Sequence, residues 1–172
     1  MPGERRIMAG DLVNIDVSAE KNGIFADTGA SFATPPVAKS IERLCRDGRR
    51  AMWTGIRQVG ADKPLAGIGL AIGEFARKNR YTLVRNLASH GVGRSLHEEP
   101  TEIATWPDRS ERRTINDGMV FTIEPFLSLG GEFAESGDDN WTLFSEPKAP
   151  TVQYEHTVVA TRRGALVVTL PG

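Results

Sequence analysis

Cysteine is almost absent from this sequence, since Cys45 is the one cysteine among 172 residues. A lone cysteine excludes a disulfide bond within the chain, and it agrees with a reducing compartment such as the cytoplasm. Cys45 lies beside Leu44 on the apolar side of a predicted helix, where a small thiol is typical of a packed core. We therefore interpret Cys45 as a buried residue rather than a nucleophile.

Long apolar runs and clusters of one charge are also missing. The N-terminal MPGERRIMAGD has no apolar stretch of signal-peptide length, and no window of the sequence approaches a membrane span. Basic residues are scattered and the net charge is -1, which gives no indication of nucleic-acid binding. We interpret the short run of Arg46, Arg49 and Arg50 as the solvated face of a helix. We expect a cytoplasmic protein that binds neither membranes nor nucleic acid.

The length and composition are those of one globular domain over residues 1–172, with 40% hydrophobic and 25% charged residues. Apolar spacing predicts two helices between runs of largely antiparallel strands, and hence an α+β architecture. The expected strands cover residues 12–18, 24–32, 119–128, 152–161 and 165–170, and the expected helices cover 37–59 and 65–79. A hairpin is expected near Gly130-Gly131. Gly69 and Gly73 either weaken the second helix or mark close packing on a sheet.

The first two strands form a predicted hairpin, because Asn22-Gly23 between them is a strong turn signal. With the turn centred near Lys21-Asn22, paired residue numbers should add up to about 43, which places Asp16 opposite Asp27 or one diagonal step away. Two carboxylates that close repel each other. Either one keeps its proton, or a cation lies between them, or both splay into water.

Two glutamates, Glu124 and Glu155, lie within otherwise apolar segments, where an unpaired carboxylate is costly. An arginine partner is the simplest explanation for each one alone. His90 is followed by Gly91 and Gly93, which free the nearby backbone to aim its ring, although a structural histidine is an equal alternative. Taken together with the two aspartates, these residues favour a metal site. Four carboxylates and an imidazole suit two divalent cations of the manganese, iron, cobalt or zinc type.

The phrases NIDV, FADTG, HGVGRSLHEEP, FTIEP and QYEHT contain these residues, and in this order they resemble type I methionine aminopeptidases. The resemblance runs from about Gly10 to Leu170. It implies the pita-bread fold, a curved and mostly antiparallel sheet backed by helices. HGVGRSLHEEP and QYEHT are more similar to this branch than to prolidases or aminopeptidases P.

The resemblance also implies individual roles in removing N-terminal methionine from peptides or nascent proteins. Asp27 and Glu155 would bridge two metal ions, Asp16 would bind one of them, and His90 with Glu124 would bind the other. A water or hydroxide held between the ions would attack the first peptide bond. Glu124 would also carry the proton from this water to the leaving amine.

On the substrate side, His97 would hydrogen-bond the scissile peptide, and Trp141 would line the methionine pocket. Leu96 occupies a pocket position where the family commonly has phenylalanine, and Ser89 stands where glycine is common. The family's N-terminal third, which supplies helices, part of the sheet, much of the pocket and a second histidine, has no counterpart in this sequence.

Without that third, an apolar sheet edge or core face should be exposed, and a second copy or a partner chain could cover it. Two other functions stay open at this point. One is an aminopeptidase of altered N-terminal specificity, and the other is a non-catalytic pita-bread protein that binds peptides or protein partners.

Overall fold

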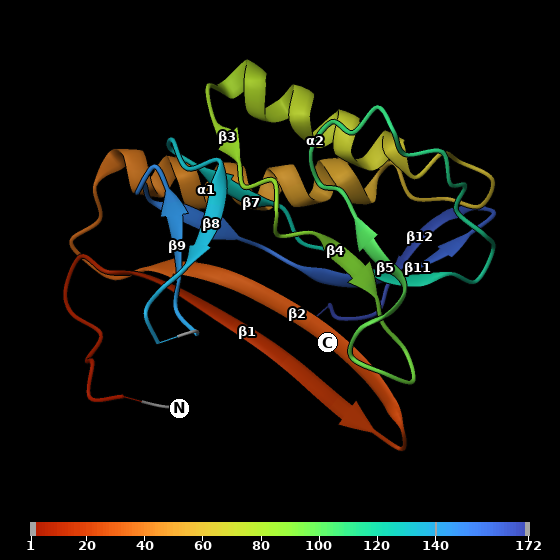
Figure 1. The fold of residues 1–172 in the computed structure, drawn as a ribbon, viewed down its shortest axis with the longest axis horizontal. Coiled ribbons are helices and arrows are strands. Elements are labelled where there is room, and N and C mark those ends of the chain that lie inside the picture. The colour runs from red at the N-terminus through yellow and green to blue at the C-terminus, as the bar shows by residue number, and fades with distance from the viewer. Residues whose placement is uncertain (1–2, 140, 171–172) are drawn as a thin grey trace.

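The computed structural model describes residues 3–139 and 141–170, so residues 1–2, 140 and 171–172 of the predicted domain lie outside it. Within these ranges the chain has the predicted α+β composition (Figure 1). The elements are β1 (Leu12–Lys21), β2 (Ile24–Ala33), α1 (Lys39–Ile56), α2 (Ala66–Asn79), β3 (Thr82–Leu83), β4 (Ser89–Gly91), β5 (Glu98–Ile103), β6 (Val120–Ile123), β7 (Phe126–Ser128), β8 (Phe133–Ser136), β9 (Leu143–Glu146), β10 (Thr151–Gln153), β11 (His156–Thr161) and β12 (Gly164–Val167).

The described strands pair antiparallel throughout, as predicted. One sheet has the order β12-β11-β6-β4-β5, another the order β10-β7-β3, and β1-β2 and β8-β9 are separate hairpins. The expected strand 119–128 is interrupted at Glu124-Pro125, between β6 and β7, and the expected strand 152–161 at Tyr154-Glu155, between β10 and β11. Because β6 pairs with β11 and β7 with β10, the two interruptions lie side by side.

The β1-β2 hairpin forms at the predicted turn, but its register differs from the prediction by two residues. Asn22 and Gly23 are both left-handed, with φ of 56° and 77°, so they form a two-residue hairpin turn. Asp16 pairs with Gly29, and Asp27 pairs with Ser18. Direct opposition of the two aspartates is therefore wrong, and the diagonal alternative is the one observed. They are diagonal neighbours on one face of the hairpin, because a shift of two residues leaves the facing of every side chain unchanged.

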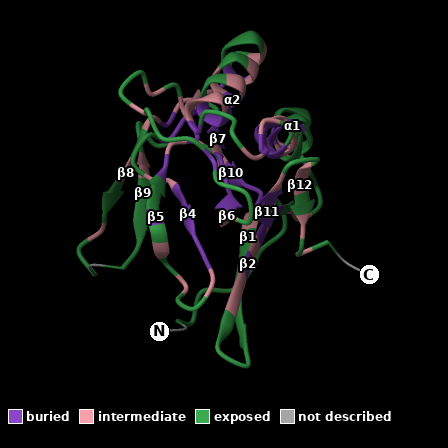
Figure 2. Cartoon of the chain, turned by 90° about the vertical axis from the view of Figure 1, so that its right-hand side faces the viewer, coloured by how far each residue is buried: buried purple, intermediate pink, exposed green. Residues whose placement is uncertain are grey.

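The two helices cover one side of the strands, and α2 lies on α1 (Figure 1). Figure 2 shows buried segments in the strands β4, β6, β10 and β11 and in parts of both helices, with the β1-β2 hairpin on the other side of these strands. The core contains Leu44, Ile56, Ile68, Ile72 and Phe121. The helix positions among them, Leu44, Ile56, Ile68 and Ile72, recur at the spacing that predicted both helices.

Gly69 and Gly73 do mark close packing, but against a loop rather than a sheet. A Cβ at Gly69 would lie 2.1 Å from the carbonyl oxygen of Trp106, and one at Gly73 would lie 2.3 Å from the Pro107 ring. The predicted hairpin at Gly130-Gly131 is wrong, since these residues connect β7 to β8, which do not pair with each other. The hairpin of this region is β8-β9, which lies further along the chain.

The helix α1 carries the arginine run, and its solvated face is confirmed, since Arg46, Arg49 and Arg50 are exposed. Cys45 is half-buried against the core rather than fully enclosed.

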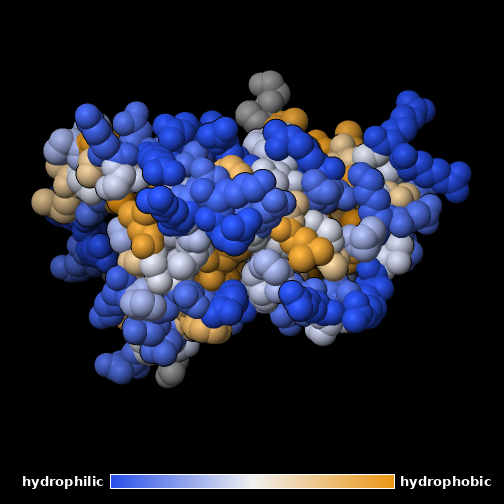
Figure 3. Space-filling model, turned by 90° about the horizontal axis from the view of Figure 1, so that it is seen from above, coloured by the Kyte–Doolittle hydropathy of each residue, from blue (hydrophilic) through white to orange (hydrophobic). Residues whose placement is uncertain are grey.

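Seen from above the helices, the surface is largely hydrophilic with apolar areas in its hollows (Figure 3). In the described part of the chain, neither helix is long and apolar enough to cross a membrane.

The outer face of the β1-β2 hairpin is apolar and exposed, as the sequence predicts. Ile15, Val17, Ile24 and Phe32 each have 50–54% of their residue surface exposed. They project from the hairpin on the side opposite the aspartates, because side chains alternate along a strand. A cavity of about 510 Å³ lies between this face and α1, where Met52 and Trp53 complete its apolar wall.

Candidate metal centre

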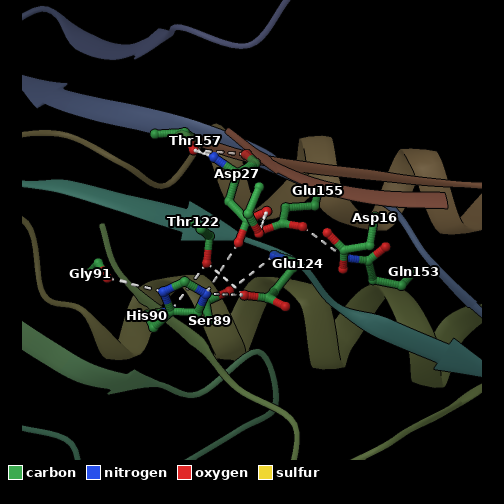
Figure 4. Close-up of polar contacts among 11 residues, drawn as sticks. Asp16, Asp27, Ser89, His90, Gly91, Thr122, Glu124, Gln153, Glu155 and Thr157 are labelled. Carbon is green, nitrogen blue, oxygen red and sulfur yellow. Dashed lines mark hydrogen bonds and ion pairs between the residues drawn. The ribbon is translucent and has the colours of Figure 1, made fainter. Parts of the chain in front are cut away.

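Side chains from five separate segments meet where the two strand interruptions lie. Asp16 comes from β1, Asp27 from β2 and His90 from β4, while Glu124 and Glu155 occupy the interruptions themselves (Figure 4). Asp27, His90 and Glu155 each offer a ligand atom, and these atoms all lie within 4.8 Å of one another. The structure therefore brings together all five residues that the sequence singled out, although their assignment as ligands stays a prediction.

Hydrogen bonds at Asp27 and at Gly29 hold the β1-β2 hairpin against β11 and the interruption that precedes it. Gly29 and Glu155 exchange two backbone hydrogen bonds, at 3.4 Å and 2.8 Å. The Thr157 hydroxyl accepts the backbone N–H of Asp27 at 2.9 Å and donates to its carbonyl at 2.8 Å. The Asp27 carboxylate accepts a further bond from Ser18 at 3.0 Å. These contacts fix the aspartate pair beside the two glutamates.

His90 is buried and oriented by its own strand. Its Nδ1 lies 3.0 Å from the carbonyl oxygen of Gly91, which requires the proton to be on Nδ1. Burial lowers the pKa of His90, so the ring is neutral and its Nε2 lone pair is free. This nitrogen lies 3.4 Å from Oε1 of Glu124 and 3.9 Å from Oδ2 of Asp27. A lone pair aimed at two carboxylates is the arrangement of a metal ligand.

Two neighbouring hydroxyl groups hold Glu124, one at its carboxyl group and one at its backbone N–H. Thr122 donates to its Oε1 at 2.7 Å, and its backbone N–H donates to the Ser89 hydroxyl at 3.0 Å. Burial raises the pKa of Glu124 to about 8, against the opposing effect of the Thr122 hydrogen bond, and the charges of Asp16 and Asp27 add to the rise. A carboxyl group with such a pKa can exchange protons near neutral pH.

Glu155 is the most enclosed of the five, with 1% of its surface exposed. Its Oε1 has no hydrogen-bond partner among the described residues. Burial, followed by the charges of Glu124, Asp27 and Asp16, raises its pKa to about 10. Burial and the Asp27 charge also raise the pKa of Asp16. A divalent cation would accept the free Oε1 lone pairs and offset the mutual repulsion, so the donor set fits a metal.

A hollow of about 410 Å³ opens beside these carboxylates, and His97 and Leu96 both line it. The rings of His97 and His90 lie with their centroids 3.9 Å apart, so His97 stands directly next to the candidate ligands. Trp141 is 80% exposed on the β8-β9 turn, and the described residues that line this hollow do not include it. The role of Trp141 in a methionine pocket stays a prediction.

Three supporting residues escaped the sequence prediction, namely Asn14, Thr122 and Gln153. Each stands two positions before a candidate ligand on the same strand or its extension. Alternate residues of a strand share a face, so a polar side chain two positions from a ligand points toward the same site. Polar residues two positions before Asp16, Glu124 and Glu155 are the sequence signal that identifies them.

Comparisons with known proteins point to one family. The sequence profile of Metallopeptidase family M24 matches residues 1–162. The chain is 38% identical to a methionine aminopeptidase of Staphylococcus epidermidis over 170 residues, which cover 98% of this chain and 68% of that protein. It is 34% identical to the methionine aminopeptidase of Escherichia coli, covering 99% of this chain and 64% of the relative. This chain thus spans about two thirds of their length.

Comparison with solved structures points to the same family. The crystal structure of methionine aminopeptidase from Rickettsia prowazekii superimposes with a TM-score of 0.93 at 34% identity, over 98% of this chain and 68% of that one. The prolidase from Pyrococcus furiosus has a TM-score of 0.75 at 22% identity, over 99% of this chain and 44% of that one, which shows a common fold. The predicted pita-bread fold is confirmed.

Proposed function

This chain belongs to metallopeptidase family M24, and we propose that it removes methionine from the N-terminus of peptides or nascent proteins. The observation that carries the proposal is the buried cluster in which Asp27, Glu155 and a neutral His90 turn ligand atoms toward one point. The names of the relatives favour methionine as the residue removed.

We propose that the cluster binds two divalent ions, of manganese, iron, cobalt or zinc. Asp27 and Glu155 would hold both ions, Asp16 one of them, and His90 with Glu124 the other. The free Oε1 of the buried Glu155 supports this assignment, as does the mixed oxygen and nitrogen donor set. When bound, such ions polarise a peptide carbonyl and lower the pKa of water.

The protein groups supply proton transfer and orientation. Glu124 would take the proton of the attacking water and deliver it to the departing amine. His97 borders the hollow, where its ring would hydrogen-bond the scissile peptide. Leu96 lines the same hollow and would contact the methionine side chain, and Trp141 would complete that pocket from the β8-β9 turn.

The expected setting is the cytoplasm, where nascent chains emerge, and the expected partners are polypeptides. The apolar outer face of the hairpin, with Ile15, Val17 and Phe32, would be covered by a second copy or by another chain. Nucleic acid is not an expected partner. The guanidinium groups of Arg43 and Arg50 are turned to the buried Asp47 carboxylate, at 3.4 Å and 3.3 Å.

The experiment is methionine release from a Met-Ala peptide by metal-stripped protein to which manganese or cobalt is added. We expect metal-dependent release, and a loss of about 100-fold or more in Glu124→Gln because general acid-base transfer is removed. Glu74→Gln is the matched control, since Glu74 is exposed on α2 and pairs with Lys78. Folded, metal-loaded protein that releases no methionine would contradict the proposal and favour a binding-only protein.

A further inference from the structure

The amide of Gln153 lies between two carboxylates of the candidate metal centre that come from opposite ends of the chain. Its Nε2 donates to Oε2 of Glu155 at 2.9 Å and to Oδ2 of Asp16 at 3.2 Å (Figure 4). A primary amide has two N–H groups, so each carboxylate receives one of them. We propose that Gln153 is a positioning residue which presets Asp16 and Glu155 for metal, and that Asn14 sets the orientation of its amide. This inference rests on the proposed metal-dependent function.

Asn14 fixes which end of the Gln153 amide faces the carboxylates. Its Nδ2 donates to Oε1 of Gln153 at 2.9 Å. An amide oxygen can only accept and an amide nitrogen can only donate, so this bond leaves Nε2 as the atom directed at Asp16 and Glu155. If the amide turned over, its oxygen would face two carboxylates, which repel it. Asn14 therefore acts on the ligands through Gln153.

The neighbouring residues hold the Gln153 backbone in place and leave room for its amide beside Asp16 and Glu155. Its N–H donates to the Ser31 hydroxyl at 3.0 Å, and the same hydroxyl accepts from Asn14 at 3.1 Å. A Cβ at Gly29 would lie 2.3 Å from Oε1 and 2.7 Å from Nε2 of Gln153. Glycine at position 29, which pairs with Asp16 in the hairpin, leaves the room that the amide occupies.

The Gln153 amide forms a bridge between Asp16 and Glu155, and this bridge has a direct consequence for metal binding. Metal binding requires both carboxyl groups in their ionised form, and two negative carboxylates on separate strands then repel each other unless a donor lies between them. The amide holds one oxygen of each and leaves Oε1 of Glu155 without a partner among the described residues, so that atom stays available to a cation. Partners that orient metal ligands in this way typically account for about 10-fold to 100-fold in affinity.

The test is a titration of metal-stripped protein with Co²⁺, followed by its visible absorption. Gln153→Met keeps the length of the side chain without its donor, and Asn14→Leu removes the bond that orients the amide. We expect each variant to weaken Co²⁺ binding by about 10-fold to 100-fold and to alter the absorption bands. The double variant should lose no more than the larger single loss, because both changes remove the same bridge.

Thr151→Val is the matched control, since Thr151 lies on the same strand and its hydroxyl contacts Ser128 and Ala149 instead. A merely structural role would lower the melting temperature of the metal-free variants and leave the Co²⁺ dissociation constant within about 2-fold, which would overturn the inference. Asn14 is exposed, so its variant decides the question if Gln153→Met does not fold. Absence of Co²⁺ binding by the unaltered protein would instead overturn the proposed function.

Discussion

The Nε2 atom of His90 lies 3.4 Å from Oε1 of Glu124, and both side chains are buried. The Nδ1 proton of His90 is directed at the Gly91 carbonyl, so its Nε2 presents a lone pair to the carboxyl group. Two acceptors at this distance need either a proton or a cation between them. The raised pKa of Glu124, to about 8, indicates that without metal the carboxyl keeps its proton at neutral pH. Metal and protons should therefore compete for this site.

The stability of the metal-free protein should fall as pH rises from about 5 to about 9. An unfolded glutamate has a pKa near 4.3, whereas burial raises the pKa of Glu124 to about 8 and that of Glu155 to about 10. Between these values the folded chain binds more protons than the unfolded chain, so the free energy of unfolding decreases with pH. Urea unfolding at several pH values in the presence of a chelator measures this slope.

Saturating Mn²⁺ should abolish or reverse that slope, because cations then stabilise the ionised carboxylates. Glu155→Gln without metal should show a shallower slope than the unaltered protein, since the group with the most strongly raised pKa is gone. A metal-free protein that becomes more stable from pH 5 to pH 9 would contradict the account.

Asp47 should stabilise the packing of α1 without affecting the metal centre. It is 1% exposed and accepts the Tyr81 hydroxyl at 3.0 Å. Asp47→Asn should lower the free energy of unfolding by about 1–3 kcal/mol, because a buried charge-assisted hydrogen bond is weakened. The arginines around it are more than half exposed, so their share of this value is small.

The pH dependence at Asp47 has the opposite sign to that of the glutamates. Burial alone would raise its pKa, but the Tyr81 hydrogen bond and the charges of the neighbouring arginines outweigh it and lower the pKa. The stabilisation is thus present above pH ~4 and lost as pH falls through the depressed pKa. Urea unfolding of Asp47→Asn at pH 3 and pH 7 checks this, with Glu74→Gln as the exposed control. An equal Asn effect at both pH values would be inconsistent with it.

Two glycines of α2 should respond to alanine in opposite ways. A Cβ at Gly69 would lie 2.1 Å from a backbone oxygen of Trp106, so Gly69→Ala should destabilise the protein by about 1–3 kcal/mol. At Gly67 the nearest atom to a Cβ is 4.0 Å away, and Gly67→Ala should stabilise it by about 0.5 kcal/mol through helix propensity. Thermal unfolding of both variants measures the contrast, and equal effects would refute this packing.

Local sequence signals were sufficient for the two helices, the β1-β2 hairpin and the shared face of its aspartates. They did not predict the strand register of this hairpin, because the predicted turn centre lay one position too early. The left-handed conformations of Asn22 and Gly23 place the turn centre between these two residues. Each residue of β1 therefore pairs with a residue of β2 that lies two positions later than predicted. Side-chain facing survived this error because its period is also two residues.

The interruptions at Glu124 and Glu155 could not be predicted from apolar spacing, which continues across both of them. Both residues make tertiary contacts in place of strand pairing, since Glu155 exchanges backbone bonds with Gly29 and the backbone N–H of Glu124 donates to the Ser89 hydroxyl. The strands β4 and β5 were also not predicted, because the glycines and charged residues around His90 leave no alternation of apolar and polar residues that would indicate a strand. The amide bridge at Gln153 depends on contacts between residues far apart in sequence, such as Asn14, and only the structure reveals it.

The most direct test of the account is a calorimetric titration of the metal-stripped protein with Mn²⁺, beside its Asp27→Asn and His90→Ala variants. We expect saturable binding that approaches two equivalents in the unaltered protein and is weakened in both variants, because each loses a ligand atom from the cluster. Circular dichroism confirms that all three proteins are folded. A folded, unaltered protein that takes up no Mn²⁺, or variants that bind it equally well, would contradict the proposed metal site.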